Sequence, residues 1–237
     1  MLQPERTDMH TYPWGFRIRT PKEQLEIWTE IFPHLKKKYC QELILSGLPI
    51  HEEGWAVIPK PSAISTDYHG AFKNILQVMK ERIKLHIKID ENDINPQRLV
   101  VKWETSKVLA AFEKTSGDDF LIFPFQFGIG LNSDSAATIR MSDSQFPLGP
   151  YEIVCLFITH PDRIVRINDL GIDCLGCGFF PKNDEMKREW ILSLFSITPR
   201  MRIPVNSDLI LSPCLHLSEH GSHSLTFGVP TGYLPLK

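Results

Sequence analysis

The sequence lacks the long apolar runs that would place it in a membrane or direct it out of the cell. No window of about 18 consecutive apolar residues occurs, and the longest apolar stretch, around 153–158, is much shorter. The N-terminal segment, 1–16, is polar and has no apolar core of the kind found in signal peptides. These absences predict a soluble, cytoplasmic protein without a membrane partner.

A strong charge of either sign is also missing. Lys and Arg number 26 and Asp and Glu number 28, which gives a formal net charge of −2. The bulk charge disfavours nucleic acid as a partner, although basic clusters occur at 36–38, at 80–88 and at Arg200 with Arg202. Because acidic residues interleave with the basic ones, a solvated helix face is the favoured interpretation.

Three nucleotide-binding and hydrolase motifs are absent. There is no G-x-G-x-x-G fingerprint, no G-x-x-x-x-G-K-[ST] phosphate loop and no G-x-S-x-G nucleophile elbow. The chemistries that depend on these motifs are therefore disfavoured.

What is present is an ordinary globular composition, with 42% hydrophobic and 23% charged residues over 237 positions. A chain of this length predicts one or two domains. We expect a single domain over 1–237, with a possible lobe boundary in the loop-rich stretch 124–147. That stretch is better interpreted as a functional loop, because neither half shows an obvious core of its own.

The order of the expected elements predicts the α+β class, helix-rich with short strands in the first two-thirds and strand-rich towards the C-terminus. The clearest helix starts at Thr20, which with Glu23 completes a capping box. Further helices are expected at 67–82, 106–114 and 149–159, the last with a buried strand as the alternative. Strands are expected at 55–58, 99–103, 120–123, 191–197, 207–211, 214–217 and 224–229.

A first candidate site is a zinc centre. Cys174 and Cys177 form a C-x-x-C pair flanked by glycines, and four further possible ligands follow: Cys214, His216, His220 and His223. Zinc prefers four thiolate or imidazole ligands, commonly supplied as two local pairs. The competing interpretation is a turn between strands that carries two buried, reduced thiols.

A second candidate overlaps the first. Residues 216–220 match H-x-x-E-H, the inverted zinc-protease motif, which requires a helix so that His216 and His220 share one face. The alternation of apolar residues instead favours a β-hairpin of 214–217 with 224–229, and on a hairpin the protease geometry cannot form.

A third candidate is a metal-dependent nuclease. Asp162 after Pro161, followed by Glu185 and Lys187, resembles the P-D…(D/E)-x-K pattern, in which two carboxylates hold Mg²⁺ and a lysine polarises the attacking water. The competing interpretation is a helix terminus followed by a charged surface run.

The run FPLGPYEIVCLFITHPDRIVRINDLGIDCLG, over 146–176, and the preceding FPFQFG resemble segments of a group of bacterial proteins to which no activity is assigned. The resemblance implies a bacterial cytoplasmic origin and carries over no catalytic residue.

Taken together, these patterns predict a non-enzymatic binding or interaction protein. The residues do not identify its partner, for which another protein and a second copy are both open. The alternatives are a zinc-binding protein or metal-dependent hydrolase that uses the C-terminal Cys and His residues, and a metal-dependent nuclease. We expect no cofactor, with zinc as the alternative, and whether the protein is an enzyme stays open at this point.

Overall fold

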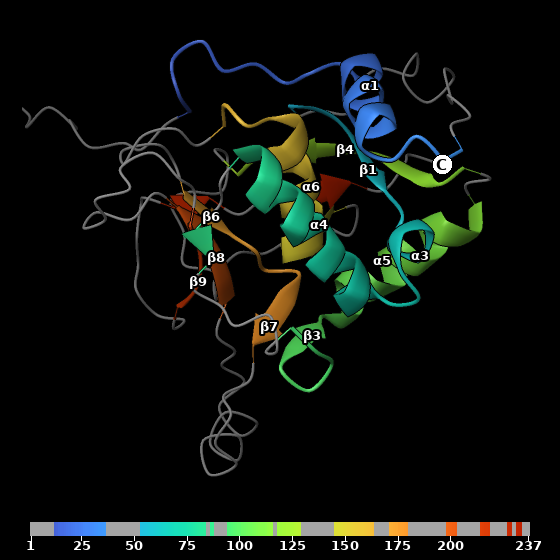
Figure 1. The fold of residues 1–237 in the computed structure, drawn as a ribbon. Helices are drawn as coiled ribbons and strands as arrows, with labels where there is room; N and C mark the ends of the chain where they lie inside the picture. Colours follow the sequence, from blue (N-terminus) through green and yellow to red (C-terminus); the bar gives the residue numbers. More distant parts are fainter. Residues whose placement is uncertain are drawn as a thin grey trace, which may run out of the picture.

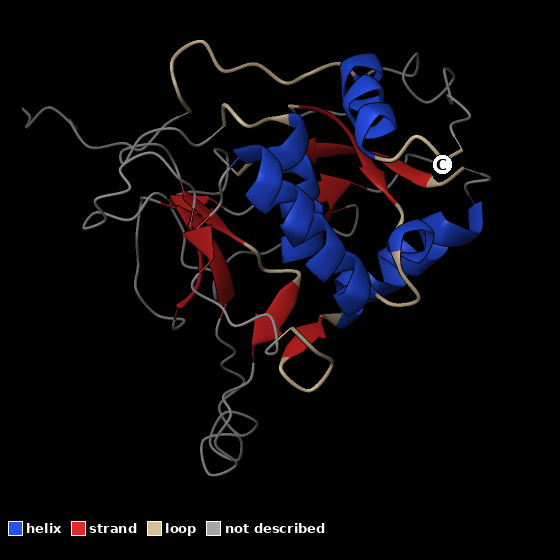
Figure 2. Cartoon of the chain, viewed as in Figure 1, coloured by secondary structure: helices blue, strands red, loops and turns tan. Residues whose placement is uncertain are grey.

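The protein, seen in a computed structural model, combines five helices with short strands in the part of the chain that is described (Figures 1 and 2). The described residues are 12–36, 53–83, 86–87, 94–115, 118–128, 145–163, 171–179, 198–202, 214–218, 227–228 and 231–233. Helices dominate the first two-thirds and strands the C-terminal part, which confirms the α+β class.

The helices are α1 (Pro21–Ile31), α3 (Pro61–Ile64), α4 (Tyr68–Ile83), α5 (Trp103–Thr115) and α6 (Pro150–Thr159). The predicted capping box starts α1: the Thr20 hydroxyl accepts from the Glu23 N–H, and the Glu23 carboxylate accepts from the Thr20 N–H at 2.7 Å. The helix ends at Ile31, just before Pro33, whose ring cannot continue it.

A four-stranded sheet packs against the helices α1, α5 and α6. Its strands, in spatial order, are β1 (Gly54–Pro59), β4 (Phe120–Gln126), β11 (Thr231–Tyr233) and β5 (Gln145–Pro147), all antiparallel to their neighbours. The strand β11, near the C-terminus, therefore pairs with two strands that lie at the two ends of the loop-rich stretch 124–147. The expected strand 120–123 continues through Pro124, and the register with β11 begins only beyond that proline, which has no N–H to donate.

Helix α1 covers the edge of β1 that faces away from β4. The wholly buried Gln24 donates to the Trp55 carbonyl at 2.7 Å and accepts from the Val57 N–H at 2.9 Å. The buried Trp28 donates its indole N–H to the Val57 carbonyl at 2.8 Å. These side chains satisfy backbone groups that a strand edge would otherwise leave unpaired.

Helix α6 lies at the centre of the core. Every residue in it is buried, and it packs against α4, β1 and α1 (Figure 1). A helix without a polar face is typical of one buried on all sides. The helix predicted over 149–159 is confirmed, and the alternative strand is not; Pro150 in the first turn favours the helical start.

The remaining strands belong to two smaller sheets. A five-stranded sheet has the order β10 (Phe227–Gly228), β6 (Gly171–Asp173), β8 (Thr198–Arg202), β9 (Cys214–Ser218) and β2 (His86–Ile87). A two-stranded ribbon pairs β3 (Leu99–Val101) with β7 (Cys177–Phe179).

Three sequence expectations are corrected by these elements. The strand expected over 99–103 ends at Val101 because α5 already begins at Trp103, three residues before its predicted start. The hairpin of 214–217 with 224–229 is wrong as drawn: β9 pairs with β8 and β2 on its two sides, while β10 pairs with β6. Alternation predicts a strand but does not specify its neighbour.

Two expected strands, at 191–197 and 207–211, lie outside the described part of the chain. Within the part that is described, no helix has both the length and the apolar composition that crossing a bilayer requires.

Candidate functional site

A pocket among the described residues lies where α3 and the start of α4 meet α5. Its volume is about 230 Å³. The lining residues are Pro61, Ser62, Thr66, Asp67, Tyr68, Val101, Ser106, Leu109, Ala110 and Glu113. Apolar walls, three hydroxyl groups, a tyrosine and two carboxylates therefore surround one small space, and the lining includes no Lys or Arg.

Asp67, one of the lining residues, also caps α4. Its carboxylate accepts from the Gly70 N–H at 2.9 Å, the bond expected of the residue just before a helix. The sequence predicts Ser65 or Thr66 for this role, and the helix starts one residue later than expected, at Tyr68. The hydrogen bond from Gly70 is the largest cause that lowers the pKa of Asp67, so its carboxylate is ionised at neutral pH.

Tyr68 connects the pocket with the core. It lines the pocket, while its hydroxyl donates to the Glu152 carboxylate at 3.1 Å and accepts from the Tyr151 N–H at 3.3 Å. The hydroxyl thereby satisfies one of the N–H groups that the first turn of α6 leaves without a helical partner. The Tyr68 ring lies beside two others, with its centroid 5.6 Å from that of Tyr151 and 5.9 Å from that of His69. Burial raises the pKa of its phenol well above the usual range.

Glu152 is a carboxyl group wholly buried at the first turn of α6. One oxygen, Oε2, accepts from the Gly149 N–H at 2.9 Å and from Tyr68, while Oε1 has no hydrogen-bond partner within the described ranges. Burial disfavours the charged form and raises the pKa of Glu152 to about 7. A Cβ at Gly149 would lie 2.8 Å from the Glu152 carboxylate and 2.6 Å from the Tyr68 hydroxyl, so a larger residue there would displace these side chains.

Cys177 completes this buried group, with its sulfur 3.6 Å from the Tyr68 hydroxyl. Burial raises its pKa above the usual range, and the nearby Glu152 acts in the same direction. Burial likewise raises the pKa of Cys155. A thiol is nucleophilic only as the thiolate, so both cysteines are chemically inert at neutral pH.

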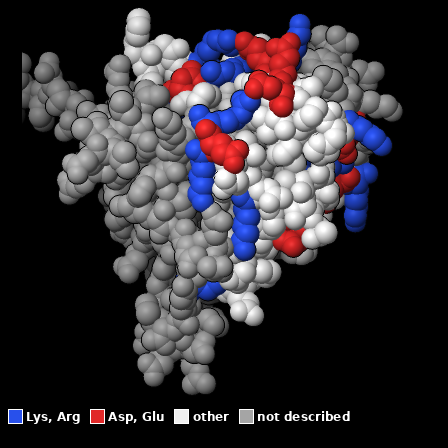
Figure 3. Space-filling model, in the orientation of Figure 1, with Lys and Arg blue, Asp and Glu red and all other residues white. Residues whose placement is uncertain are grey.

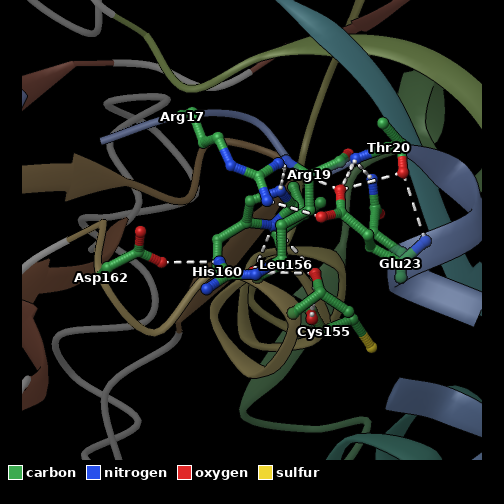
Figure 4. Close-up of polar contacts among 10 residues, drawn as sticks. Arg17, Arg19, Thr20, Glu23, Cys155, Leu156, His160 and Asp162 are labelled. Atoms are coloured by element: carbon green, nitrogen blue, oxygen red, sulfur yellow. Dashed lines mark hydrogen bonds and ion pairs between the residues drawn. The ribbon is translucent and has the colours of Figure 1, made fainter. Parts of the chain in front are cut away.

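The other end of α6 carries a second buried titratable group, His160 (Figure 4). Its Nε2 accepts from the Arg19 backbone N–H at 2.9 Å, which places the ring proton on Nδ1, 3.0 Å from the Leu156 carbonyl. The ring thus binds the segment before α1 to the end of α6. Burial lowers the pKa of His160 to about 4. The Arg19 side chain forms an ion pair with Asp162 at 2.6 Å beside it.

An aromatic cluster surrounds this end of the helix. The wholly buried Arg163 places its guanidinium 4.2 Å from the ring centre of Tyr12 and 5.2 Å from that of Phe127. The Tyr12 hydroxyl donates to Glu53 at 2.5 Å, and the Phe127 N–H donates to the same carboxylate at 3.2 Å. These cation–π contacts and hydrogen bonds are internal, and they fix the segment 12–20 against the core.

The C-x-x-C pair lies where β6 connects to β7: Cys174 follows β6, and Cys177 is the first residue of β7. Cys174 and Cys177 are both buried, and the Cys177 N–H donates to the Cys174 carbonyl at 3.4 Å. No group of three or more His, Cys, Asp or Glu side chains suited to a metal ion is found among residues whose placement is described.

The remaining predicted zinc ligands lie in or beyond β9. Cys214 and His216 belong to this strand, whereas His220 and His223 lie outside the described residues. A strand over 214–218 is not the helix that the inverted protease motif requires. The zinc centre itself stays a prediction.

The nuclease candidate is represented by one residue. Asp162 lies in the turn after α6 and is paired with Arg19, rather than placed on a strand. Glu185 and Lys187 lie outside the described part of the chain, so this candidate also stays a prediction.

The charged residues on the face drawn in Figure 3 are mixed in sign. Arg17 pairs with Glu23 at 2.5 Å, and Arg82 pairs with Glu30. The arginine of the basic cluster at 80–88 therefore has an acidic partner in the adjacent helix, in keeping with a solvated face.

The pocket and the buried acid behind it were not found from the sequence. Glu152 follows Pro150 by two residues inside an apolar run, and an acid in such a run is the one signal that could have drawn attention to it. Tyr68 carries no local signal, because its partners are 83 and 109 positions away.

Comparison with known proteins identifies no relative. No family model, no curated protein and no solved structure matches the chain.

Proposed function

We propose that the protein is a non-enzymatic binding protein and that its binding site is the pocket between α3, α4 and α5, which takes a small positively charged ligand. One observation carries this proposal: two carboxylates, of Asp67 and Glu113, line a small pocket with apolar walls and without a lining Lys or Arg.

The electrostatics favour a cation over an anion. Asp67 is ionised at neutral pH, and a cation in the pocket would be attracted by this carboxylate and by that of Glu113. An anion in the same place would be repelled by both groups. The cations close to these residues, Lys60, whose ammonium donates to the Glu113 carbonyl at 3.2 Å, and Lys73, which acts on Asp67, do not line the pocket.

The chemistry of the nearby buried groups supports binding rather than catalysis. Cys155 and Cys177 are protonated thiols, and the ring nitrogens of His160 are occupied by backbone partners. A catalytic nucleophile or base has to reach its substrate, whereas these groups are enclosed in the core and none of them lines the pocket.

The volume of the pocket limits the ligand. About 230 Å³ is below the range of roughly 300–1,000 Å³ that is typical of sites for drug-sized molecules. We therefore expect a single small amine or one side-chain-sized group, with an affinity in the range of about 1 mM, or roughly −4 kcal/mol.

The test is a titration of the full chain with two probes of similar shape and opposite charge, butylammonium and butanoate, followed by protein-observed NMR. Butylammonium should shift signals of α4 and α5 with a dissociation constant near 1 mM, whereas butanoate should not. Glu113→Gln should weaken butylammonium binding roughly two- to fivefold, because it removes one charge pair.

The matched control is Glu104→Gln on the same helix, an exposed residue outside the lining. It should leave the affinity unchanged. Equal binding of the two probes, or an equal effect of the two variants, would contradict the proposal, as would the absence of any response to butylammonium at tens of millimolar.

A further inference from the structure

Helix α5 turns one continuous face to the pocket. Ser106, Leu109, Ala110 and Glu113 are three or four residues apart, the spacing at which side chains share a helix face. Trp103, the first residue of the helix, lies three residues before Ser106 and therefore belongs to the same face. Side chains on a helix lean towards its N-terminus, so the indole extends this face beyond the end of the pocket lining.

Trp103 is exposed to an extent that is unusual for its type. Its side chain is 73% exposed, although most tryptophans of a folded chain are largely buried. An exposed indole on the helix that lines the pocket is available to a ligand. A second aromatic residue, Tyr68, lines the same pocket, and its hydroxyl is committed to Glu152 and to the Tyr151 N–H.

Two aromatic rings combined with carboxylates discriminate between types of cation. A primary ammonium carries three N–H donors, each of which needs an acceptor once water is removed. An alkylated ammonium has fewer donors or none, its methyl groups suit apolar walls, and its diffuse charge is attracted to the faces of Trp and Tyr rings. The lining supplies apolar contact from Val101, Leu109 and Ala110.

We propose that the ligand of the pocket carries an alkylated ammonium group, such as trimethylammonium, with Trp103 as the aromatic rim, Tyr68 as the aromatic wall, and Asp67 and Glu113 as the countercharges. This inference rests on the proposed function, since it names the class of cation that the same pocket takes.

The experiment measures the affinity of the full chain for three probes by NMR titration. Choline carries the trimethylammonium group, 3,3-dimethylbutan-1-ol has the same shape without charge, and ethanolamine is the corresponding primary amine. Choline should bind about 5- to 30-fold more tightly than 3,3-dimethylbutan-1-ol, the range that cation–π attraction supplies. It should also bind more tightly than ethanolamine.

Two variants test the role of the indole. Trp103→Ala should weaken choline binding about fivefold or more, and Trp103→Phe should retain part of the affinity because a phenyl ring keeps a weaker negative face. Trp14→Ala is the matched control: Trp14 is 94% exposed and does not line the pocket, so its loss should leave choline binding unchanged. Both tryptophans are exposed, so their replacement should leave the fold intact, which circular dichroism checks.

The outcomes separate the two proposals. If butylammonium and ethanolamine bind while choline binds no better and Trp103→Ala has no effect, the alkylated-ammonium inference is overturned and the cation pocket stands. If 3,3-dimethylbutan-1-ol binds as tightly as choline, the charge has no role and both proposals fail. If no amine binds, both fail as well.

Discussion

The two ends of α6 each hold a buried titratable residue, and the two have opposite responses to the same environment. Glu152 lies in the first turn and His160 directly after the last. A helix dipole would favour the carboxylate at the N-terminal end and the imidazolium at the C-terminal end. Burial outweighs the dipole at both ends: it raises the pKa of Glu152 to about 7 and lowers the pKa of His160 to about 4.

The hydrogen bonds at the two ends give both groups a structural role. Each connects the end of α6 to a segment distant in sequence, through Tyr68 of α4 at one end and through the Arg19 backbone at the other. At each end of α6, a buried polar group positions neighbouring elements through its hydrogen bonds. Burial keeps that group in its neutral form.

The pH dependences of the two ends have opposite signs. The neutral form of Glu152 is favoured in the folded state, so its contribution is present below pH 4.5 and is lost as the pH rises through about 7. The neutral form of His160 is also favoured, so its contribution is present above pH 6.5 and is lost as the pH falls towards about 4. Between these limits the two contributions largely offset each other.

The charged and titratable neighbours of Glu152 and His160 do not reverse the direction of either pKa shift. Glu152 faces Tyr68, Cys177, Tyr151 and Cys155, all neutral at pH 7. The neighbours of His160 are Arg17, Arg19 and Asp162, of which the two arginines oppose its protonation.

The largest loss of stability is expected from a substitution at the histidine end of α6. We expect His160→Ala to lower the free energy of unfolding by about 3 kcal/mol at pH 7, because it leaves the Arg19 N–H without its acceptor and opens a cavity among aromatic rings. Since the variant lacks the titrating group, its deficit should shrink by up to about 3 kcal/mol as the pH falls from 6.5 to 4. Urea unfolding at pH 7 and pH 4.5 measures both effects.

The control for this variant is His34→Ala, which removes an exposed histidine. It should change stability by less than about 0.5 kcal/mol and leave the pH dependence intact. A deficit of His160→Ala that stays constant with pH would show that the ring is not neutral in the folded state.

The acid end is tested by Glu152→Gln, which keeps the shape and cannot ionise. Relative to the wild-type chain, the variant should gain about 2–3 kcal/mol between pH 4.5 and pH 8, because only the wild-type chain bears a buried charge at the higher pH. The change with pH is the readout, since the buried amide adds a constant penalty of its own. A parallel pair of stability curves would contradict the raised pKa.

A smaller effect is expected when the link to α4 is removed. Tyr68→Phe deletes the hydroxyl that donates to Glu152 and accepts from the Tyr151 N–H, so stability should fall by about 1–2 kcal/mol at pH 6. The hydroxyl stabilises the carboxylate form, so its loss should raise the pKa of Glu152 further. Carboxyl NMR titration of the variant measures this shift, and a lower pKa would be the opposite result.

The smallest effect is expected at the exposed ion pair beside His160. Asp162→Asn removes the partner of the Arg19 side chain, and the Asp162 side chain is 43% exposed. We expect a loss of less than about 1 kcal/mol that diminishes further at high salt. A loss as large as that of His160→Ala would mean that the side-chain pair, rather than the imidazole, holds the segment before α1.

Local signals were sufficient for the elements whose cause is local. The Thr20–Glu23 box, the helix over 149–159 and the alternating strand at 214–217 depend on neighbours within a few positions, and all three elements are confirmed. The start of α5 and the cap of α4 were misplaced by one to three residues, because several nearby residues can serve as caps and tertiary contacts select one.

The candidate site could not be predicted from the sequence. The pocket needs α3, which was not predicted, together with α4 and α5, and each of these contributes only a few lining residues. The buried group likewise joins Tyr68, Glu152 and Cys177 from three separate segments. Neither grouping has a periodicity or a spacing that a pattern could detect.

The sequence by itself determined the α+β class, the helices α1, α4, α5 and α6, and the strands β1, β3, β4 and β9, because capping and apolar periodicity act over one or two turns. It did not indicate α3 or the short strands β2, β5, β6, β7, β8 and β11. Only the tertiary structure decided that β11 enters between β4 and β5, that α1 covers the edge of β1, and that a carboxyl group and an imidazole at the ends of α6 are both neutral. The physical reason is that strand neighbours and desolvation depend on contacts between residues far apart in the chain, whose energies no local pattern records.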